Sequence, residues 1–182
     1  MSVLGACATP WMDGINAVDV VAIDDAAVVG PRVLVVVAHA DDEIAFAGAL
    51  YKTATLLRGA CDVVTITNGE GGFKYATLAE PVYGLELTDP TVGRAALPAI
   101  RRAELSEGCR YLRVRRLFLL AQKDHRYTLD PREVLDPVDG VWDVPFVRRA
   151  LRSILDAGHY DFVLTLTPVE DTHGHHKAAT LL

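Results

Sequence analysis

The amino-acid sequence predicts an α/β fold in which helices cover both faces of a mainly parallel sheet. The first observation is an alternation of short apolar, β-branched runs with longer segments of helical periodicity. The second is that the run at 33–38 is apolar throughout, which is typical of a strand buried on both faces. Right-handed crossovers between such strands place helices on both sides of the sheet. The predicted fold is therefore a Rossmann-like three-layer sandwich.

The domain organisation is simple. A chain of 182 residues fits one domain. Residues 1–30 are predicted to be an N-terminal extension, with a short edge strand at 18–23. The organised domain is expected at 31–182.

The first crossover unit begins with the strand at 33–38. A helix is expected from about 42 to 57, where Gly59 ends it. Its small residues at 45–49 predict close packing on the sheet. A second strand is predicted at 62–67. The glycine-rich segment 69–95 is expected to be a long functional loop.

The same alternation continues to the end of the chain. Asp143 is predicted to cap a helix, with Pro145 in its first turn and Gly158 after its last. A helix is expected at 98–112, followed by a strand at 116–120 and a polar loop at 121–142. The helix capped by Asp143 spans 143–158, a strand follows at 161–166, and a final helix starts at 173.

Composition excludes several classes of protein. The net charge is −6 and the isoelectric point about 5.4, which argues against a nucleic-acid partner. The sequence has no run of 18 apolar residues, so no membrane span is predicted. The three cysteines, Cys7, Cys61 and Cys109, are far apart and form no CxxC pair, which favours a cytoplasmic protein.

Two clusters of histidines and carboxylates follow predicted strands. Residues 38–43 follow the first strand, residues 167–176 follow the fourth, and together they hold four of the six histidines. Ligands of open α/β sheets bind at the carboxyl ends of the strands, so both clusters are expected at one edge. A hydrolytic zinc site needs about three nitrogen or oxygen ligands and an open position for water. The conjunction favours a metal-dependent hydrolase.

Each cluster also has a simpler interpretation. The three acidic residues 41–43 suit a helix N-terminus, where carboxylates are stabilised. The histidines at 173–176 alone could form a solvated turn. Residues 69–72 could be a phosphate loop in a non-catalytic or inactive α/β module that binds a sugar or nucleotide. That segment lacks P-loop spacing, however.

Four motifs resemble one known family in content and order. Residues 38–43, Ala-His-Ala-Asp-Asp-Glu, resemble the AHPDDE signature of the LmbE-like, or PIG-L, zinc-dependent N-acetylglucosaminyl deacetylases. Residues 173–176 resemble the second signature of that family, HxDH. Between them, residues 67–72 resemble its TDGEAG-like turn, and residues 101–105 resemble its RxxEL segment. The resemblance covers residues 32–182.

The resemblance implies roles for the matching residues. His39, Asp42 and His176 are expected to bind Zn²⁺, although such sites also accept iron, cobalt or manganese. Asp41 is expected to be the general base for the attacking water. His173 is expected to stabilise the oxyanion or to protonate the leaving amine. The implied substrate is a small N-acetylated sugar or related amide, and the products are acetate and a free amine.

The same resemblance assigns substrate binding to Arg101. The alternative for Arg101 is a helix-surface salt bridge with Glu104 or Glu107. Selectivity is expected to lie in the two long loops, whose polar candidates are Glu70, Lys74, Tyr75, Asp124, His125, Arg126 and Tyr127.

The sequence departs from the family pattern in three ways. Ala40 replaces a proline, with little expected effect. His175 replaces the aspartate of HxDH, so the carboxylate that would orient His173 is missing and His175 becomes a competing ligand. Glu170 or Asp171 would have to compensate. The chain ends six residues after His176, whereas the family continues. The domain is therefore expected to be short at its C-terminus and to form a homo-oligomer that covers a bare sheet edge.

Overall fold

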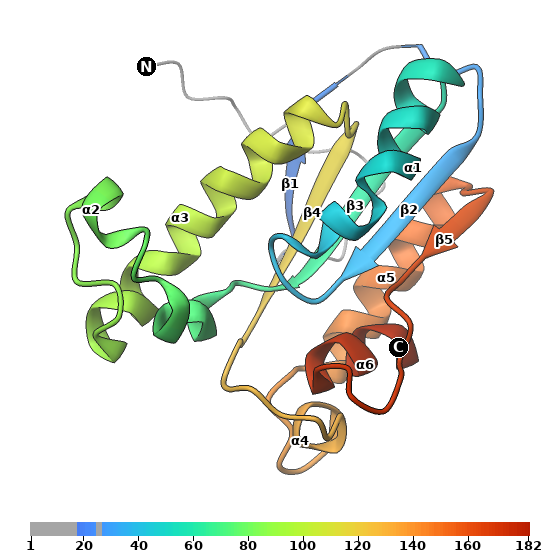
Figure 1. Ribbon diagram of the computed structural model, residues 1–182. Coiled ribbons are helices and arrows are strands. Elements are labelled where there is room, and N and C mark those ends of the chain that lie inside the picture. Colours follow the sequence, from blue (N-terminus) through green and yellow to red (C-terminus); the bar gives the residue numbers. More distant parts are fainter. Residues whose placement is uncertain (1–17, 25–26) are drawn as a thin grey trace.

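The computed structural model describes residues 18–24 and 27–182 (Figure 1). Most of the predicted extension at 1–30, including Cys7, lies outside this part of the chain. Cys61 and Cys109 are buried free thiols. Within the described ranges, no helix is both long enough and apolar enough to cross a membrane.

A five-stranded sheet organises the domain, with strand order β1-β4-β3-β2-β5. Four strands run parallel, and only β1, at the edge, is antiparallel to its neighbour β4. This arrangement confirms the predicted mainly parallel fold and the predicted edge strand near residue 18. The strands are β1 (Asp19–Ala22), β2 (Arg32–Val37), β3 (Ala60–Thr67), β4 (Arg116–Gln122) and β5 (Phe162–Leu164).

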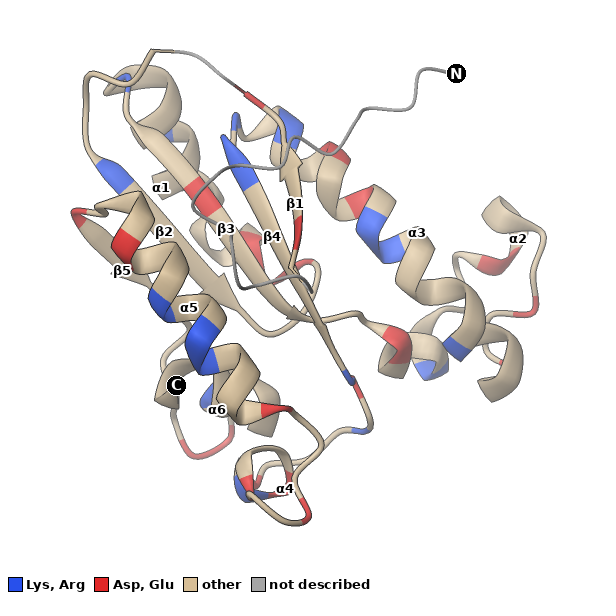
Figure 2. Ribbon diagram, turned by 180° about the vertical axis from the view of Figure 1, so that it is seen from behind, with Lys and Arg blue, Asp and Glu red and all other residues tan. Residues whose placement is uncertain are grey.

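Helices cover both faces of the sheet. On one face α1 (Ala47–Tyr51) and α3 (Pro90–Tyr111) pack on the sheet through buried Leu50, Leu105 and Cys109. Figure 2, seen from behind, shows α5 over the opposite face. The helices that pack there are α4 (Arg132–Leu135), α5 (Val144–Gly158) and α6 (Gly174–Leu181). Asp143 caps α5 as predicted, but His159 rather than Gly158 takes the left-handed conformation at its end.

The helix predicted at 42–57 consists of three short pieces. A 3₁₀ helix η2 (Asp42–Phe46) leads into α1, and a π-helical turn η3 (Lys52–Leu56) follows. The small residues do not pack closely on the sheet: Ala45, Gly48 and Ala49 are exposed, and nothing lies within 4 Å of a Cβ placed on Gly48. Leu50 makes the contact instead, because it is the fully buried residue of this segment.

The segment 69–95 is largely helical rather than an open loop. It contains a 3₁₀ helix η4 (Glu70–Tyr75), α2 (Glu80–Tyr83) and the start of α3. The carboxylate of Asp89 caps α3 by accepting hydrogen bonds from the next two free N–H groups. Pro98, predicted to begin this helix, lies inside it.

The last strand is shorter than the predicted 161–166. Only residues 162–164 pair with β2. The hydroxyl of Thr165 instead lies 2.5 Å from that of Thr180, on α6. Phe162 and Val163 are 58% and 47% exposed on this edge strand. Homo-oligomerisation stays a prediction.

A buried ionic cluster lies near the amino-terminal ends of the parallel strands. Asp62 is completely buried in β3. Its Oδ2 accepts hydrogen bonds of 2.6 Å from Arg115 Nη2, Arg116 Nη2 and the Tyr160 hydroxyl. Burial disfavours the charged carboxylate, but the two guanidinium groups outweigh it and lower the pKa of Asp62. These contacts tie β3 to β4 and to the start of β5.

Candidate metal centre

Three side chains meet at the carboxyl end of β2. His39 follows β2, Asp42 opens η2, and His176 lies in the first turn of α6, which lies beside the end of β2 (Figure 1). His39 Nδ1 is 3.1 Å from His176 Nε2. Asp42 Oδ1 is 3.2 Å from the same His176 nitrogen, and Asp42 Oδ2 is 3.6 Å from His39 Nδ1. The structure thus brings together the three residues predicted as metal ligands.

These separations fit a tetrahedral ion. With metal–ligand bonds of about 2.1 Å, the ligand atoms of a tetrahedral zinc site lie about 3.4 Å apart. The donor set of two imidazoles and one carboxylate leaves a fourth position for water or substrate. All three side chains are largely buried, with 10–21% exposed. The residues present therefore fit a hydrolytic zinc site.

The loop after β2 is held in place by its own polar groups. The carboxylate of Asp42 accepts a 2.8 Å hydrogen bond from the backbone N–H of His39. Glu43, which is buried, accepts one of 2.9 Å from the N–H of Asp41. Asp41 itself has φ of 120°, outside the usual range for a side-chain-bearing residue. Asp41 is the N-cap residue of η2 but makes no side-chain capping hydrogen bond, and Asp42 contacts His176 as well as its own loop.

Asp41 contacts an arginine from α3. Arg101 Nη2 lies 2.7 Å from Asp41 Oδ2 and also donates to the carbonyl of Ala40. Arg101 Nη1 donates to Glu104 at 2.9 Å. The helix-surface salt bridge foreseen for Arg101 is thus present, and Arg101 also lines the same pocket as His39.

His173 lies at the N-cap of α6. Its Nδ1 accepts a 3.0 Å hydrogen bond from the backbone N–H of His175. Burial, with the neighbouring histidines His175, His39 and His176, lowers the pKa of His173 to about 4. A neutral imidazole that accepts at Nδ1 carries its proton on Nε2. His173 therefore has a hydrogen-bond donor available to a ligand.

Asp124 and His125 lie beside His39 and His175. The sequence predicts them only as polar loop candidates for selectivity. Asp124 Oδ1 lies 3.4 Å from His175 Nδ1 and 3.7 Å from His39 Nε2. His125 Nδ1 lies 3.2 Å from His175 Nε2. Their position in the sequence could have indicated this, because both residues follow the carboxyl end of β4, as the predicted ligands follow the carboxyl ends of other parallel strands.

Opposite charges dominate the electrostatics of this centre. Burial lowers the pKa of His39, but Asp124 and Asp42 outweigh that effect and raise it to about 9. The pKa values of Asp42 and Asp124 are lowered, because their histidine neighbours outweigh the opposing effect of burial. His39 thus lies between two carboxylates, one beside each ring nitrogen.

A pocket of about 570 Å³ opens over these groups. Apolar side chains from the segment between η4 and α2 and from α3 form an apolar wall, and charged groups also line the pocket. Its size fits a small-molecule ligand. The candidate site residues that line it are His39, Asp41, Asp42, Arg101, Asp124, His173 and His176.

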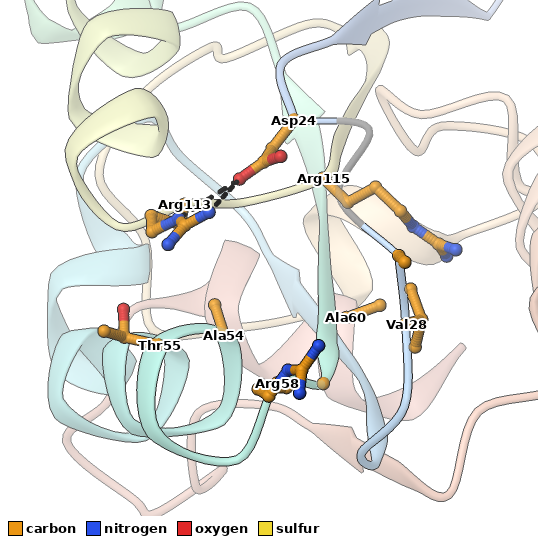
Figure 3. Close-up of a pocket in the computed structure, with 10 residues that line it drawn as sticks. Asp24, Val28, Ala54, Thr55, Arg58, Ala60, Arg113 and Arg115 are labelled. Carbon is orange, nitrogen blue, oxygen red and sulfur yellow. Dashed lines mark hydrogen bonds and ion pairs between the residues drawn. The ribbon is translucent and has the colours of Figure 1, made fainter.

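Another pocket, of about 200 Å³, lies at the amino-terminal edge of β3 and β4 (Figure 3). Arg58, Arg113 and Arg115 line it, and Asp24 forms an ion pair with Arg113. None of the predicted site residues borders this pocket. The chemistry foreseen from the sequence therefore belongs to the pocket over His39.

Comparisons with known proteins agree with this fold. The solved structure of GalB, the 4-carboxy-2-hydroxymuconate hydratase from Pseudomonas putida KT2440, is similar with a TM-score of 0.62 and 20% identity. The N,N'-diacetylchitobiose deacetylase from Pyrococcus horikoshii is similar with a TM-score of 0.58 and 23% identity. These matches cover 83% and 84% of this chain, but only 53% and 47% of those proteins. The chain thus spans about half their length.

A search of curated proteins finds no match. The family model described as PIG-L, GlcNAc-PI de-N-acetylase, matches residues 34–182. That range contains all the predicted site residues and the whole pocket over His39. The chain belongs to the PIG-L family.

Proposed function

We propose that the protein is a zinc-dependent N-deacetylase that removes an acetyl group from a small N-acetylated sugar or a related amide. Residues 31–182 form the unit that carries this activity. The observation that supports it most is the meeting of His39, Asp42 and His176 at ligand spacing, in the pocket that also contains Asp41 and His173. Membership of the PIG-L family and the fold shared with a chitobiose deacetylase add support.

His39, Asp42 and His176 would hold the zinc. When bound there, zinc supplies a Lewis acid that lowers the pKa of water to about 7 and polarises a carbonyl. Other divalent metals suit the same donors. The fit rests on two imidazoles and one carboxylate, a donor set common in zinc hydrolases.

The remaining groups divide the proton transfers between them. The carboxylate of Asp41 takes a proton from the attacking water. Arg101 fixes that carboxylate through the 2.7 Å contact and lines the pocket for polar groups of the substrate. His173 donates from Nε2 to the oxygen that becomes negatively charged, or to the leaving amine. The apolar wall that includes Leu78, Leu97 and Ile100 faces the rest of the substrate.

The test is acetate release from a panel of N-acetylated sugars, with the zinc content measured on the same sample. Wild type should release acetate, whereas Asp41→Asn should retain zinc and lose nearly all turnover, because it removes the base and no ligand. A hydratase reaction like that named for GalB would release no acetate. Zinc-loaded wild type that releases no acetate from any member would contradict the deacetylase proposal.

A further inference from the structure

His175 is a completely buried histidine whose two ring nitrogens both face other histidines. Its exposed fraction is 0%, and the ring of Trp142 lies 5.6 Å from it, centroid to centroid. Its Nδ1 lies 3.0 Å from His39 Nε2, and its Nε2 lies 3.2 Å from His125 Nδ1. A buried imidazole needs a partner for each nitrogen, and these two contacts provide both.

A metal bound to His39, as in the proposed function on which this step rests, fixes the direction of the hydrogen bond between His39 and His175. His39 Nδ1 faces the other two ligand atoms, so a neutral His39 that binds metal through Nδ1 holds its proton on Nε2. At a separation of 3.0 Å, one nitrogen must donate and the other accept. His39 Nε2 is therefore the donor, and His175 Nδ1 is the acceptor.

The direction of the hydrogen bonds is the same farther from the metal site. A neutral His175 that accepts at Nδ1 carries its proton on Nε2 and donates it to His125 Nδ1. His125 then carries its proton on Nε2, which lies 3.6 Å from the carboxylate of Glu133. Arg126 holds that carboxylate in turn, at 2.8 Å. All ring protons in the row point the same way, from the metal toward Glu133.

A carboxylate reinforces the inner end of this row. Asp124 Oδ1 lies within 3.7 Å of the facing nitrogens of both His39 and His175. Asp124 Oδ2 accepts a 3.2 Å hydrogen bond from the N–H of Gly71. Asp124 is 7% exposed, and its Oδ1 lies 3.4 Å from His175 Nδ1 and 3.7 Å from His39 Nε2. It therefore provides negative charge beside the hydrogen bond between these two rings, where little water can compete, while the metal bound at His39 Nδ1 sets which nitrogen donates.

We propose that His175 and His125 are positioning residues that orient the ligand His39 through a relay of imidazoles ending at Glu133. The relay accepts the N–H of His39 and so fixes its tautomer and ring orientation, as a single carboxylate does for many metal-binding histidines. His175 replaces the acidic residue of the family signature, and Asp124, from the loop after β4, restores the negative charge. The compensating carboxylate foreseen at Glu170 or Asp171 is instead Asp124, whose Oδ1 lies 3.4 Å from His175 Nδ1.

Nitrogen-15 NMR of the zinc-loaded wild-type protein tests the relay directly, because long-range couplings distinguish the two neutral tautomers of histidine. We expect His175 and His125 both to carry the proton on Nε2, and His39 to be bound through Nδ1. A proton on Nδ1 of His175 would overturn the proposal while leaving the deacetylase function intact. Failure of wild type to bind zinc would instead contradict the proposed function as well.

Zinc affinity, measured by competition with a chromophoric chelator, tests the positioning role. His175→Leu removes the acceptor and should weaken binding about 10–100-fold, the usual effect of losing an outer partner. His175→Gln offers an acceptor and a donor and should recover most of that loss. His159→Gln, at the exposed end of α5, is the matched control and should bind as wild type.

Two results would overturn the proposal. One is equal zinc affinity for folded His175→Leu and wild type, which would show that His175 only packs in the protein interior. The other is two zinc ions per wild-type chain with only one in His175→Leu, which would make His175 a ligand. Circular dichroism of each variant checks that the comparison is between folded proteins.

Discussion

Arg101 Nη2 lies 2.7 Å from Asp41 Oδ2, so the proposed general base is held by an arginine from another element of the fold. Asp41 belongs to the loop after β2, and Arg101 projects from α3. The same nitrogen also donates to the carbonyl of Ala40. The position of the base is therefore set by α3 as well as by its own loop.

Replacement of Arg101 should separate catalysis from metal binding. In Arg101→Ala the Asp41 carboxylate loses its fixed position, and small displacements of a catalytic group cost up to about 100-fold in rate. We expect acetate release to fall by about 10–100-fold while the zinc content stays at the wild-type level. Arg102→Ala is the matched control, because Arg102 pairs with the exposed Asp19. Loss of zinc from Arg101→Ala would show that Arg101 supports the metal site itself.

A methyl group on Gly71 should disturb Asp124. A Cβ at Gly71 would lie 2.5 Å from Asp124 Oδ1, whereas one at Gly72 meets nothing within 4 Å. Gly71→Ala should therefore displace the carboxylate beside His39 and weaken zinc binding about 10-fold, as loss of an outer partner does. Gly72→Ala should bind zinc as wild type does. Equal affinities, measured by chelator competition, would show that Asp124 does not support His39.

Asp62 should contribute stability far from the candidate site. Asp62→Asn leaves Arg115 and Arg116 without their shared carboxylate, and breaking such a buried pair costs about 3–5 kcal/mol. Urea unfolding at pH 7 should show this loss. Asp19→Asn, which removes only an exposed ion pair with Arg102, should cost less than about 1 kcal/mol.

The same variant should change how stability depends on pH. Because folding lowers the pKa of Asp62, its stabilisation is fully present above the unfolded value of about 3.9. That stabilisation is lost as the pH falls through the lower pKa of the folded state. The stability difference between wild type and Asp62→Asn should thus shrink only below about pH 4. A difference that shrinks between pH 7 and 5 would point to another group.

Much of the fold was predictable because buried parallel strands have a clear pattern. The apolar run after Arg32 and the run ending at Thr67 both form strands as expected. The helical content of 69–95 was missed because glycines and prolines usually mark loops. Pro98 was misplaced because a proline normally begins a helix, whereas here α3 continues through it without the N–H that would bond the carbonyl of Arg94.

The site was predictable where its residues are neighbours in sequence. His39, Asp41 and Asp42 lie in one motif, and His173 and His176 lie in another. Asp124 was harder to place, because its contact with His39 depends on how β4 ends and on the loop that follows. Ala121, near the end of β4, has φ of 49°, a left-handed conformation that an alanine in the sequence does not predict.

The central claim is that His39, Asp42 and His176 bind one catalytic metal ion, and elemental analysis of purified protein tests it most directly. We predict about one zinc per wild-type chain, almost none in His176→Ala, and one in the control His159→Ala. Folded wild type that binds no divalent metal, or His176→Ala that binds as much zinc as wild type, would contradict the account.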